Sequence, residues 1–418
     1  MIAEGFLRTL LQRHPATDHA EYGKIAFVFC GGGCKAIIQA AAAAELVAAG
    51  LTPNHIISSS AGTCNALGFV ENPGSIGAEK TIRIWEDYIT SPDAIYEAHP
   101  FLREKLTNLL GVVPQATQNY GPSKSIFRDL KRAINFMPLV LSLCMRMPFR
   151  AAGRAVSFIF RLMDTFESQH RSFRRLVQAP EILELLDEVD KYFEFKRMKA
   201  FLDPFPLLAR LGEQIDLQKV LNSPIIWHIL TERYEDGATV IFSNKDADVA
   251  MDGSEDPRSQ KAKSDLFFKR IRASMALYPL FEMVEMDGYR YLDPDLANPV
   301  PVEEAFSLGC DTVFIFLNVP KTSIRVDPHP LRDLLELNDL SRLNERFIHH
   351  RVNDAQVKAR KFGVNLFVFR PEEIPGGLGL LEIDAKMIEY VKKHERNRMK
   401  EYLANLDAHN LRYAPLIR

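Results

Sequence analysis

Two strand-to-helix turns near the start of the chain do most to restrict its fold. The apolar run at residues 24–30 has the length of a buried strand, ends in three glycines and leads into an alanine-rich stretch that favours a helix. A second apolar run, residues 55–57, ends in a serine-rich turn at residues 58–62, and small residues follow again. Because one strand–helix–strand unit brings both turns to the same edge of a sheet, we expect an α/β fold with its candidate site at that edge.

The serine-rich turn is typical of an exposed nucleophile. A serine on a sharp turn between a strand and a helix needs small neighbours, because the turn is strained and the helix starts close to the strand. Ala61 and Gly62 after Ser60 are such neighbours, whereas Ser58 stands where the usual motif has its first glycine. Taken alone, the turn is equally compatible with a serine-rich connection that carries no chemistry.

The glycine turn exposes backbone N–H groups that suit an anion, and two anions are compatible with it. The spacing Gly31-x-Gly33-x-x-Ala36 matches a dinucleotide fingerprint, which also needs an acidic residue at the end of the second strand to hold a ribose. Serines occupy that place here, which argues against a nicotinamide or flavin cofactor. The other anion is the oxyanion of a tetrahedral intermediate, which has to lie about 3 Å from the N–H donors and from the attacking serine.

A third segment supplies a carboxylate for the serine. Residues 272–281 read RASMALYPLF and residues 287–302 read DGYRYLDPDLANPVPV, in which Asp293 follows a short aromatic strand and enters a proline-rich turn. In this order and spacing, the three segments resemble the patatin-like phospholipase family, over residues 23–70 and 225–320. That family carries a glycine-rich oxyanion loop followed by a basic residue, a G-x-S-x-G elbow, and an aspartate that completes a Ser-Asp dyad.

The resemblance implies a role for each matching residue. Ser60 corresponds to the nucleophile, Asp293 to its dyad partner, and Lys35 to a basic residue that meets an anionic headgroup or simply stays in solvent. The residues that correspond to the oxyanion hole are Gly31, Gly32, Gly33 and Ala61. The resemblance also implies a three-layer α/β fold with a mainly parallel central sheet and a large helical insert, and a reaction that needs no metal and no other cofactor.

The residues permit an ester hydrolysis in two steps. Asp293 accepts the proton of Ser60, Ser60 attacks an ester carbonyl, and water releases the acyl-enzyme. A carboxylate is a weak base for a serine hydroxyl in water, so this hypothesis requires a desolvated pocket. The competing arrangement is a Ser-Asp-His triad with His329, His349 or His350 as the base. His329 lies in a proline turn and the other two in a charged helical stretch that favours solvent, which argues for the dyad.

Three departures from the family pattern favour a second interpretation, in which the site is degenerate. Ser58 replaces the first elbow glycine, Ala36 replaces the glycine that closes the oxyanion loop, and Pro294-Asp295 replaces two glycines after the aspartate. A side chain at position 58 can crowd the turn, and strain of this kind costs about 1–3 kcal/mol. Asp295 also adds a second carboxylate, and two like charges close together raise the pKa of one of them.

Cysteine content and the first residues bear on the compartment. The five cysteines form an odd set without metal-ligand spacing, which favours a reducing compartment over a disulfide framework. Residues 1–11 lack the basic leader and apolar core of an ordinary secretory signal. We therefore expect a cytoplasmic protein with peripheral membrane association, while export by a route that needs no such signal stays open.

A basic and apolar stretch, residues 124–175, predicts contact with a membrane surface. It holds 11 Lys and Arg against 3 Asp and Glu, a net charge of +8 in a chain of net charge −2. Its apolar runs are too short to span a bilayer, but basic residues beside apolar faces suit helices that lie in an anionic interface. The candidate contacts recur near the helical period, at Arg146, Arg150, Arg154 and Arg161. The alternative is a cap with solvated arginines, and nucleic-acid binding would leave the apolar runs without a role.

The chain divides into three expected parts. An N-terminal helix, residues 1–22, precedes a catalytic region at 23–320 with a mainly helical insert at 75–220, and a strand and helices at 321–418 pack on that region. The strands expected after the insert are residues 224–231, 238–243, 312–317 and 365–369, with a polar loop at 244–264 before a helix at 264–275 and a charged helix after residue 383.

These features predict a lipid acyl hydrolase, a phospholipase A or lysophospholipase that cleaves acyl esters at a phospholipid surface, with or without a protein activator. Two alternatives stay open: an acyltransferase that uses the same Ser60, and a catalytically degenerate, membrane-associated binding or scaffold protein. Turnover of an acyl ester that disappears in Ser60→Ala separates an enzyme from the scaffold.

Overall fold

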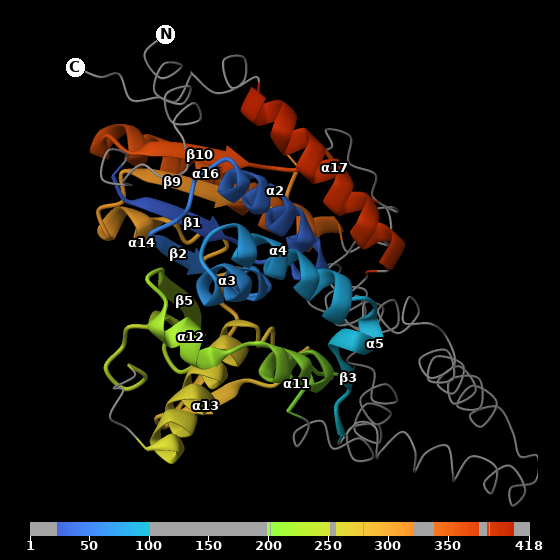
Figure 1. Ribbon diagram of the computed structural model, residues 1–418, viewed down its shortest axis with the longest axis vertical. Coiled ribbons are helices and arrows are strands. Elements are labelled where there is room, and N and C mark those ends of the chain that lie inside the picture. Colours follow the sequence, from blue (N-terminus) through green and yellow to red (C-terminus); the bar gives the residue numbers. More distant parts are fainter. Residues whose placement is uncertain are drawn as a thin grey trace, which may run out of the picture.

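A mixed sheet forms the centre of the molecule (Figure 1). Its strands follow the order β10-β9-β1-β2-β5-β8-β7, and β6 pairs with β5. The strands from β10 to β5 are parallel to one another, whereas β6, β7 and β8 pair in the antiparallel sense. The computed structural model describes residues 23–100, 199–200, 202–250, 256–278, 280–320, 338–375, 383 and 385–404.

The strands lie close to where the apolar runs predict them. The sheet consists of β1 (Ile25–Phe29), β2 (His55–Ser58), β5 (Ile226–Arg233), β6 (Ala238–Ser243), β7 (Val284–Met286), β8 (Tyr289–Leu292), β9 (Thr312–Phe316) and β10 (Asn365–Phe369). Two further short strands, β3 (Glu97–Ala98) and β4 (Leu202–Asp203), pair with each other. The expected hairpin after the insert is confirmed as the antiparallel pair of β5 and β6.

Strand β1 alternates between two hydrophobic cores, one on each face of the sheet. Ile25, Phe27 and Phe29 pack in a core with side chains of α2, α3 and α17, whereas Ala26 and Val28 pack in a second core with those of α14 and α16. All five side chains are buried. The run is continuously apolar because a parallel strand covered on both faces has no solvent side. The expected three-layer α/β fold is thereby confirmed.

Helices cover both faces of the sheet (Figure 1). On the first face lie α2 (Ile37–Ala48), α3 (Gly62–Glu71), α4 (Ser75–Arg83), α13 (Pro257–Ser274) and α17 (Ala385–Ala404), and on the second lie α14 (Val302–Ser307) and α16 (Asn338–Phe362). Smaller elements are α5 (Pro92–Ile95), α11 (Phe205–Gln214), α12 (Leu217–Asn222), the π-helical turn η3 (Ile84–Tyr88) and the 3₁₀ turns η2 (Gly33–Ala36) and η5 (Pro294–Leu296). Residues 37–47 of α2 are all buried, which explains the alanine-rich sequence of this helix.

The C-terminal elements complete the sheet and cover α2. β10 pairs in parallel with β9, in register from Asn365 to Phe369. α17 lies against α2, where Arg396 forms an ion pair with the buried carboxylate of Glu45 (Figure 1). Residues 1–22 lie outside the described residues, so the division of the chain into three parts stays a prediction.

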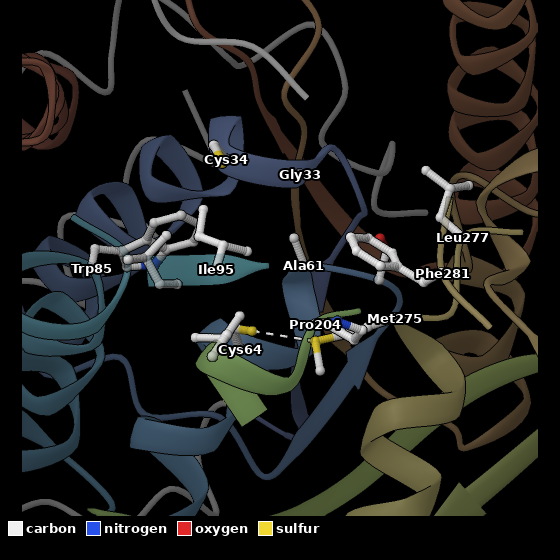
Figure 2. A pocket seen from close by; sticks show the side chains of 13 residues that line it. Gly33, Cys34, Ala61, Cys64, Trp85, Ile95, Pro204, Met275, Leu277 and Phe281 are labelled. Atoms are coloured by element: carbon white, nitrogen blue, oxygen red, sulfur yellow. Dashed lines mark hydrogen bonds between the residues drawn. The ribbon is translucent and has the colours of Figure 1, made fainter. Parts of the chain in front are cut away.

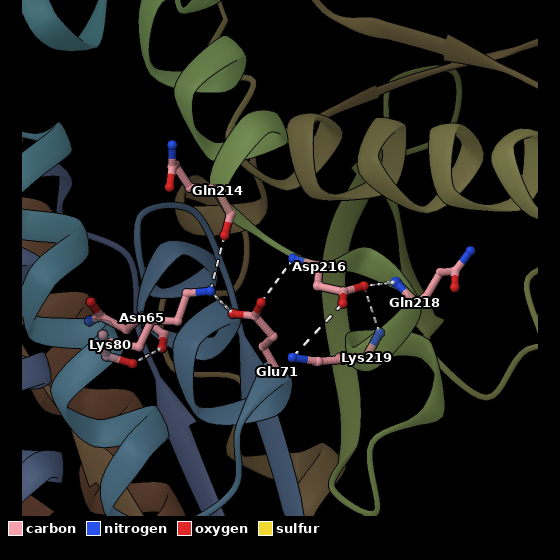
Figure 3. A network of polar contacts seen from close by, with 8 residues as sticks. Asn65, Glu71, Lys80, Gln214, Asp216, Gln218 and Lys219 are labelled. Carbon is pink, nitrogen blue, oxygen red and sulfur yellow. Dashed lines mark hydrogen bonds and ion pairs between the residues drawn. The ribbon is translucent and has the colours of Figure 1, made fainter.

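A buried carboxylate connects α3 and α4 to residues 214–216, near the end of the expected insert (Figure 3). Glu71, at the end of α3, accepts a hydrogen bond from the N–H of Asp216 (2.8 Å) and pairs with Lys80 of α4. Lys80 also donates to the backbone oxygen of Gln214 at the end of α11 (3.0 Å), and the Asp216 side chain caps α12. Because the Glu71 side chain is only 3% exposed, its buried negative charge needs these partners for compensation. The same contacts fix where the chain returns to the core.

Most of the expected insert lies outside the described residues. This applies to residues 101–198, and with them to the membrane-contact candidates Arg146, Arg150, Arg154 and Arg161. In the part of the chain that the structure describes, no helix combines the length and apolarity needed to cross a bilayer.

The polar loop expected before α13 is shorter than predicted. The composition suggests a loop to Ser264, but the helix begins at Pro257. Asp256 caps it by accepting hydrogen bonds from the N–H groups of Arg258 (2.7 Å) and Ser259 (3.0 Å). An aspartate followed by proline is a favourable helix start, and this signal outweighs the polar composition of the first turns.

Candidate active site

The glycine turn and the serine turn lie side by side at the carboxyl edge of the sheet. β1 and β2 are parallel neighbours, and Phe29 is in register with Ser58. The N–H of Ser59 donates to the Phe29 carbonyl oxygen (3.1 Å), which continues the pairing into the turn. The single strand–helix–strand unit expected from the sequence therefore brings both loops together.

The serine turn has the strained backbone of a nucleophile elbow. Ser60 has φ = 51°, in a region that costs energy for any residue other than glycine. Its N–H donates to both the carbonyl oxygen and the Oγ of Ser274 (3.2 Å each), a fully buried residue at the end of α13. A Cβ on Gly62 would lie 2.5 Å from the Phe29 carbonyl oxygen, so only glycine allows α3 to start this close to β1. Ser274, to which the sequence assigned no role, holds the elbow.

The serine in place of the first elbow glycine is accommodated by hydrogen bonding. Ser58 is fully buried, and its hydroxyl accepts a hydrogen bond from the indole N–H of Trp227 (2.8 Å) and lies 3.3 Å from the hydroxyl of Thr63. The positive φ occurs at Ser60 and not at position 58. The crowding that the sequence suggests at Ser58 is therefore not found.

The glycine turn is held by Asn318, which follows β9 at the same edge of the sheet. Gly32 has φ = 145° and Gly33 has φ = 60°, conformations that other residues rarely adopt. The Asn318 side-chain amide donates to the Gly31 carbonyl oxygen (2.8 Å), and a Cβ on Gly32 would collide with this amide. The sequence analysis missed Asn318, although its position directly after a buried strand is a usable signal.

Asp293 lies on the turn after β8. The residue is 1% exposed, its N–H donates to the Ala276 carbonyl oxygen (3.1 Å), and its Oδ1 accepts from the N–H of Asp295 (2.9 Å). Pro294 opens the 3₁₀ turn η5, where its missing N–H is not needed. The second carboxylate oxygen, Oδ2, is buried and has no hydrogen-bond partner in the described structure.

Burial and a like charge raise the pKa of the Asp293 carboxyl well above its ordinary value. Burial is the larger cause, and the negative charge of Asp295 adds to it. The side chain of Ser60 lowers the pKa as a hydrogen-bonding neighbour, although the contact falls short of a well-formed bond to Oδ2. A raised pKa makes Asp293 a stronger base than a solvated aspartate, as proton removal from a serine requires.

A second carboxylate, that of the partly buried Asp295, contacts both turns. It accepts a hydrogen bond from the Ser59 hydroxyl (2.9 Å) and another from the backbone N–H of Gly31. Burial raises the pKa of Asp295 to about 6, while these two hydrogen bonds and the charge of Lys35 act in the opposite direction. The Gly31 N–H is therefore occupied. The remaining candidates for oxyanion donors are the N–H groups of Gly32, Gly33 and Ala61.

Lys35 and Ala36 belong to the 3₁₀ turn that follows the glycines. The charge of Lys35 lowers the pKa of the Asp295 carboxyl, so this lysine lies near that carboxylate of the site. Ala36, in place of the closing glycine, is fully buried, and its carbonyl oxygen accepts from the side chain of Asn65 (2.8 Å). The alanine is thus part of the packed start of α2, and the expected role of Lys35 toward a headgroup stays a prediction.

An apolar cleft opens over the elbow (Figure 2). Its walls come from both turns, from the segment after α4, from α11 and from the turn after α13; the lining residues are Gly33, Cys34, Ser60, Ala61, Cys64, Trp85, Ile89, Ile95, Pro204, Leu207, Met275, Leu277 and Phe281. In Figure 2, Trp85 and Ile95 lie on the opposite side of Ala61 from Leu277 and Phe281. A lining of this kind excludes water and suits a hydrocarbon chain.

Trp85 reaches the cleft from a π-helical turn, η3, that continues α4. Its indole N–H donates to the Oδ1 of Asn65 (2.8 Å), which fixes the ring. π-Helical turns are rare and occur frequently at functional sites. The sequence analysis identified no wall of the cleft here, because an unusual helical turn leaves no simple periodic pattern.

No histidine of the described residues is hydrogen-bonded to Ser60 or Asp293. His349 lies 2.7 Å from the guanidinium of Arg370 through its Nδ1, so it is partly buried and not solvated as expected. His350 is exposed as expected, and His329 lies outside the described residues. The choice of the dyad over the triad therefore stays a prediction.

The described residues contain no group of three or more His, Cys, Asp or Glu side chains that suits a metal ion. Their cysteines are all buried, none of these cysteines forms a disulfide, and Cys34 and Cys64 line the cleft. Burial raises the pKa of the Cys64 thiol to about 12, which keeps it protonated beside the elbow.

Comparisons with known proteins identify the family of the chain. The sequence matches the family model of patatin-like phospholipases over residues 27–306. Among solved structures, VipD from Legionella pneumophila is 11% identical, with 91% of this chain and 67% of that chain covered and a TM-score of 0.33. Human GIVD cytosolic phospholipase A2 is 11% identical, with coverages of 78% and 52% and a TM-score of 0.29, so the match spans about half of that enzyme. No curated protein sequence matches this chain.

At these TM-scores the assignment rests on the family match, which covers about two thirds of the chain. The chain belongs to the patatin-like phospholipase family, a family of lipid hydrolases.

Proposed function

We propose that this chain hydrolyses acyl esters of phospholipids or lysophospholipids at a membrane surface, with Ser60 as nucleophile and Asp293 as base. The observation that carries the proposal is a strained serine under an apolar cleft, together with a buried carboxylate, Asp293, whose pKa Ser60 lowers as a hydrogen-bonding neighbour. A nucleophile, a base and a water-excluding cleft at one place are what acyl transfer to a serine requires.

The reaction proceeds through an acyl-enzyme. The proton of the Ser60 hydroxyl passes to Asp293 Oδ2 as Oγ bonds to the ester carbonyl carbon. The N–H groups of Gly32, Gly33 and Ala61 are proposed to stabilise the oxyanion that forms. The C–O bond to the alcohol then breaks, and the proton on Asp293 returns to the departing oxygen. A water molecule reverses these roles and releases the fatty acid.

Binding at the surface is assigned to cationic side chains. Lys35 lies close enough to Asp295 for its charge to lower the pKa of that carboxyl, and in this proposal it also meets the phosphate of the headgroup. The arginines of residues 146–161 are proposed to contact anionic lipids, each with about 1 kcal/mol of attraction. The cleft holds the acyl chain that is cleaved.

The proposal is tested by labelling the full-length chain with a fluorophosphonate probe, with and without anionic liposomes. We expect labelling of Ser60, its loss in Ser60→Ala, and a much slower reaction in Asp293→Asn. Ser307→Ala is the matched control, because that hydroxyl bonds Glu304 on α14, on the second face of the sheet. Labelling that persists in Ser60→Ala, or no labelling of the wild type under any lipid condition, would contradict the proposal and favour a scaffold.

A further inference from the structure

The carboxylate of the partly buried Asp295, on the loop that carries Asp293, contacts the other two loops of the candidate site. It accepts hydrogen bonds from the Ser59 hydroxyl (2.9 Å) on the elbow and from the backbone N–H of Gly31 on the glycine turn. Its own N–H donates to Asp293 Oδ1 (2.9 Å). A Cβ on Gly31 would overlap the Asp295 carboxylate, so the glycine leaves the space that this side chain occupies.

The surroundings favour a charged Asp295 despite its burial. A buried carboxylate is costly unless hydrogen bonds or an opposite charge compensate it, and Asp295 has both. The titratable side chains that act on the two carboxylates, apart from each other, are Lys35, Glu232 and Cys30. Lys35 is the cation among them, and it acts on Asp295. Among the described residues, no cation acts on Asp293 in this way, and the charge that acts on it most is that of Asp295.

We propose that Asp295 is a positioning residue, which holds the elbow, the glycine turn and the Asp293 loop together and keeps a negative charge beside Asp293. This inference rests on the proposed function of Ser60 and Asp293. When Asp293 takes the Ser60 proton, its own charge disappears, and with it the repulsion from Asp295. The neighbouring charge thus favours the protonated state of Asp293 that forms as Ser60 attacks. Asp295 itself exchanges no proton with the substrate.

The two carboxylates are best distinguished by NMR titration of full-length protein with ¹³Cγ-labelled aspartate. The Asp293 signal is identified by its absence in Asp293→Asn. In Asp295→Asn, which removes the charge but keeps a side chain of similar shape, we expect the titration midpoint of Asp293 to fall by about one pH unit or more. An unchanged midpoint would overturn the inference. This measurement needs no enzymatic activity.

Ser59→Ala provides a second variant if Asp295→Asn does not fold. Because the Ser59 hydroxyl bonds the Asp295 carboxylate and lowers its pKa, losing that bond should raise the Asp295 midpoint above about 6. A midpoint equal to that of the wild type would again contradict the role assigned to Asp295.

The pH profile of kcat/KM for an acyl ester connects the titration to catalysis. We expect Asp295→Asn to lower kcat/KM about tenfold or more and to move the acidic limb to lower pH, since the base becomes weaker. Asp265→Asn, an exposed carboxylate of α13, is the matched control. If turnover in Asp295→Asn depends on Ser60 and has the pH profile of the wild type, the role of Asp295 would be overturned while the proposed function would stand. Turnover that does not depend on Ser60 would contradict the proposed function, and the NMR titration would then still decide the role of Asp295.

Discussion

A pair of acidic side chains lies at one end of the parallel strands, and a pair of basic side chains lies at the other. At the carboxyl end, Asp293 and Asp295 share a loop, and burial raises the pKa of both. Near the amino end, His55 Nδ1 and His228 Nε2 lie 3.2 Å apart, and burial lowers the pKa of both imidazoles, that of His228 to about 4. At each end, therefore, burial favours the neutral form of the titratable side chains.

The difference between the two ends lies in what surrounds each pair. The carboxylates lie beside a strained serine and an apolar cleft. One of their oxygen atoms, Asp293 Oδ2, has no hydrogen-bond partner among the described residues. The imidazoles bond each other, and His228 lies 3.7 Å from the carboxylate of Glu304. A perturbed pKa alone therefore does not identify a catalytic group, and the neighbouring nucleophile and cleft are needed as well. We interpret the histidine pair as part of the packing.

The largest expected effect is on enzymatic activity, which should depend on the carboxylates at one end of the strands and not on the histidines at the other end. Asp293→Asn should lower kcat/KM for an acyl ester by about 10³-fold or more, because an amide cannot take the Ser60 proton. The same change should raise the melting temperature at neutral pH, since it removes a buried group whose ionisation is disfavoured in the fold. His228→Gln is the control and should retain activity. A loss of activity in His228→Gln at unchanged stability would contradict the assignment.

The second effect is on stability against pH and concerns the amino end. Because the pKa of His228 is lowered from 6.5 to about 4 in the fold, the unfolded chain binds more protons between these values. The free energy of unfolding should therefore fall by up to about 3 kcal/mol as the pH drops from 6.5 to 4. Urea unfolding across this range should show a flatter pH dependence in His228→Gln. The exposed His350→Gln should behave as the wild type, and equal slopes in all three proteins would contradict the prediction.

The third effect concerns the close packing of the elbow at the carboxyl end. Gly62→Ala places a methyl group 2.5 Å from the Phe29 carbonyl oxygen and should cost about 2 kcal/mol of stability, together with the elbow geometry. Gly212→Ala on α11 meets only a ring atom at 3.8 Å and should be neutral or slightly stabilising. Denaturant unfolding and probe labelling of both variants measure the contrast. Equal stability of the two variants would show that the elbow tolerates a wider separation from β1.

The smallest effect concerns Ser58. Restoring the family's glycine by Ser58→Gly leaves the indole N–H of Trp227 buried without its acceptor, so we expect a loss of about 1–2 kcal/mol with nearly unchanged kcat. The loss should shrink in a Trp227→Phe background, which a double-mutant cycle measures. A gain of stability in Ser58→Gly would support the crowding that the sequence alone suggests.

The strands and turns that form the site could be predicted from local sequence, whereas the side-chain contacts between them could not. β1 and the elbow were predictable because a strand buried on both faces is continuously apolar and a nucleophile turn needs small residues. The bond between Ser59 and Asp295 joins residues 236 positions apart, and composition cannot indicate it. The wall around Trp85 was missed for a similar reason, since it depends on where a π-helical turn packs.

The structure of the chain after reaction with a long-chain fluorophosphonate tests the Ser60–Asp293 site most directly. We predict a covalent bond from Ser60 Oγ to phosphorus, a phosphonyl oxygen within hydrogen-bond distance of the N–H groups of Gly32, Gly33 and Ala61, and the alkyl chain in the apolar cleft. An adduct on another residue, or a phosphonyl oxygen that points away from these donors with the chain outside the cleft, would contradict the site described here.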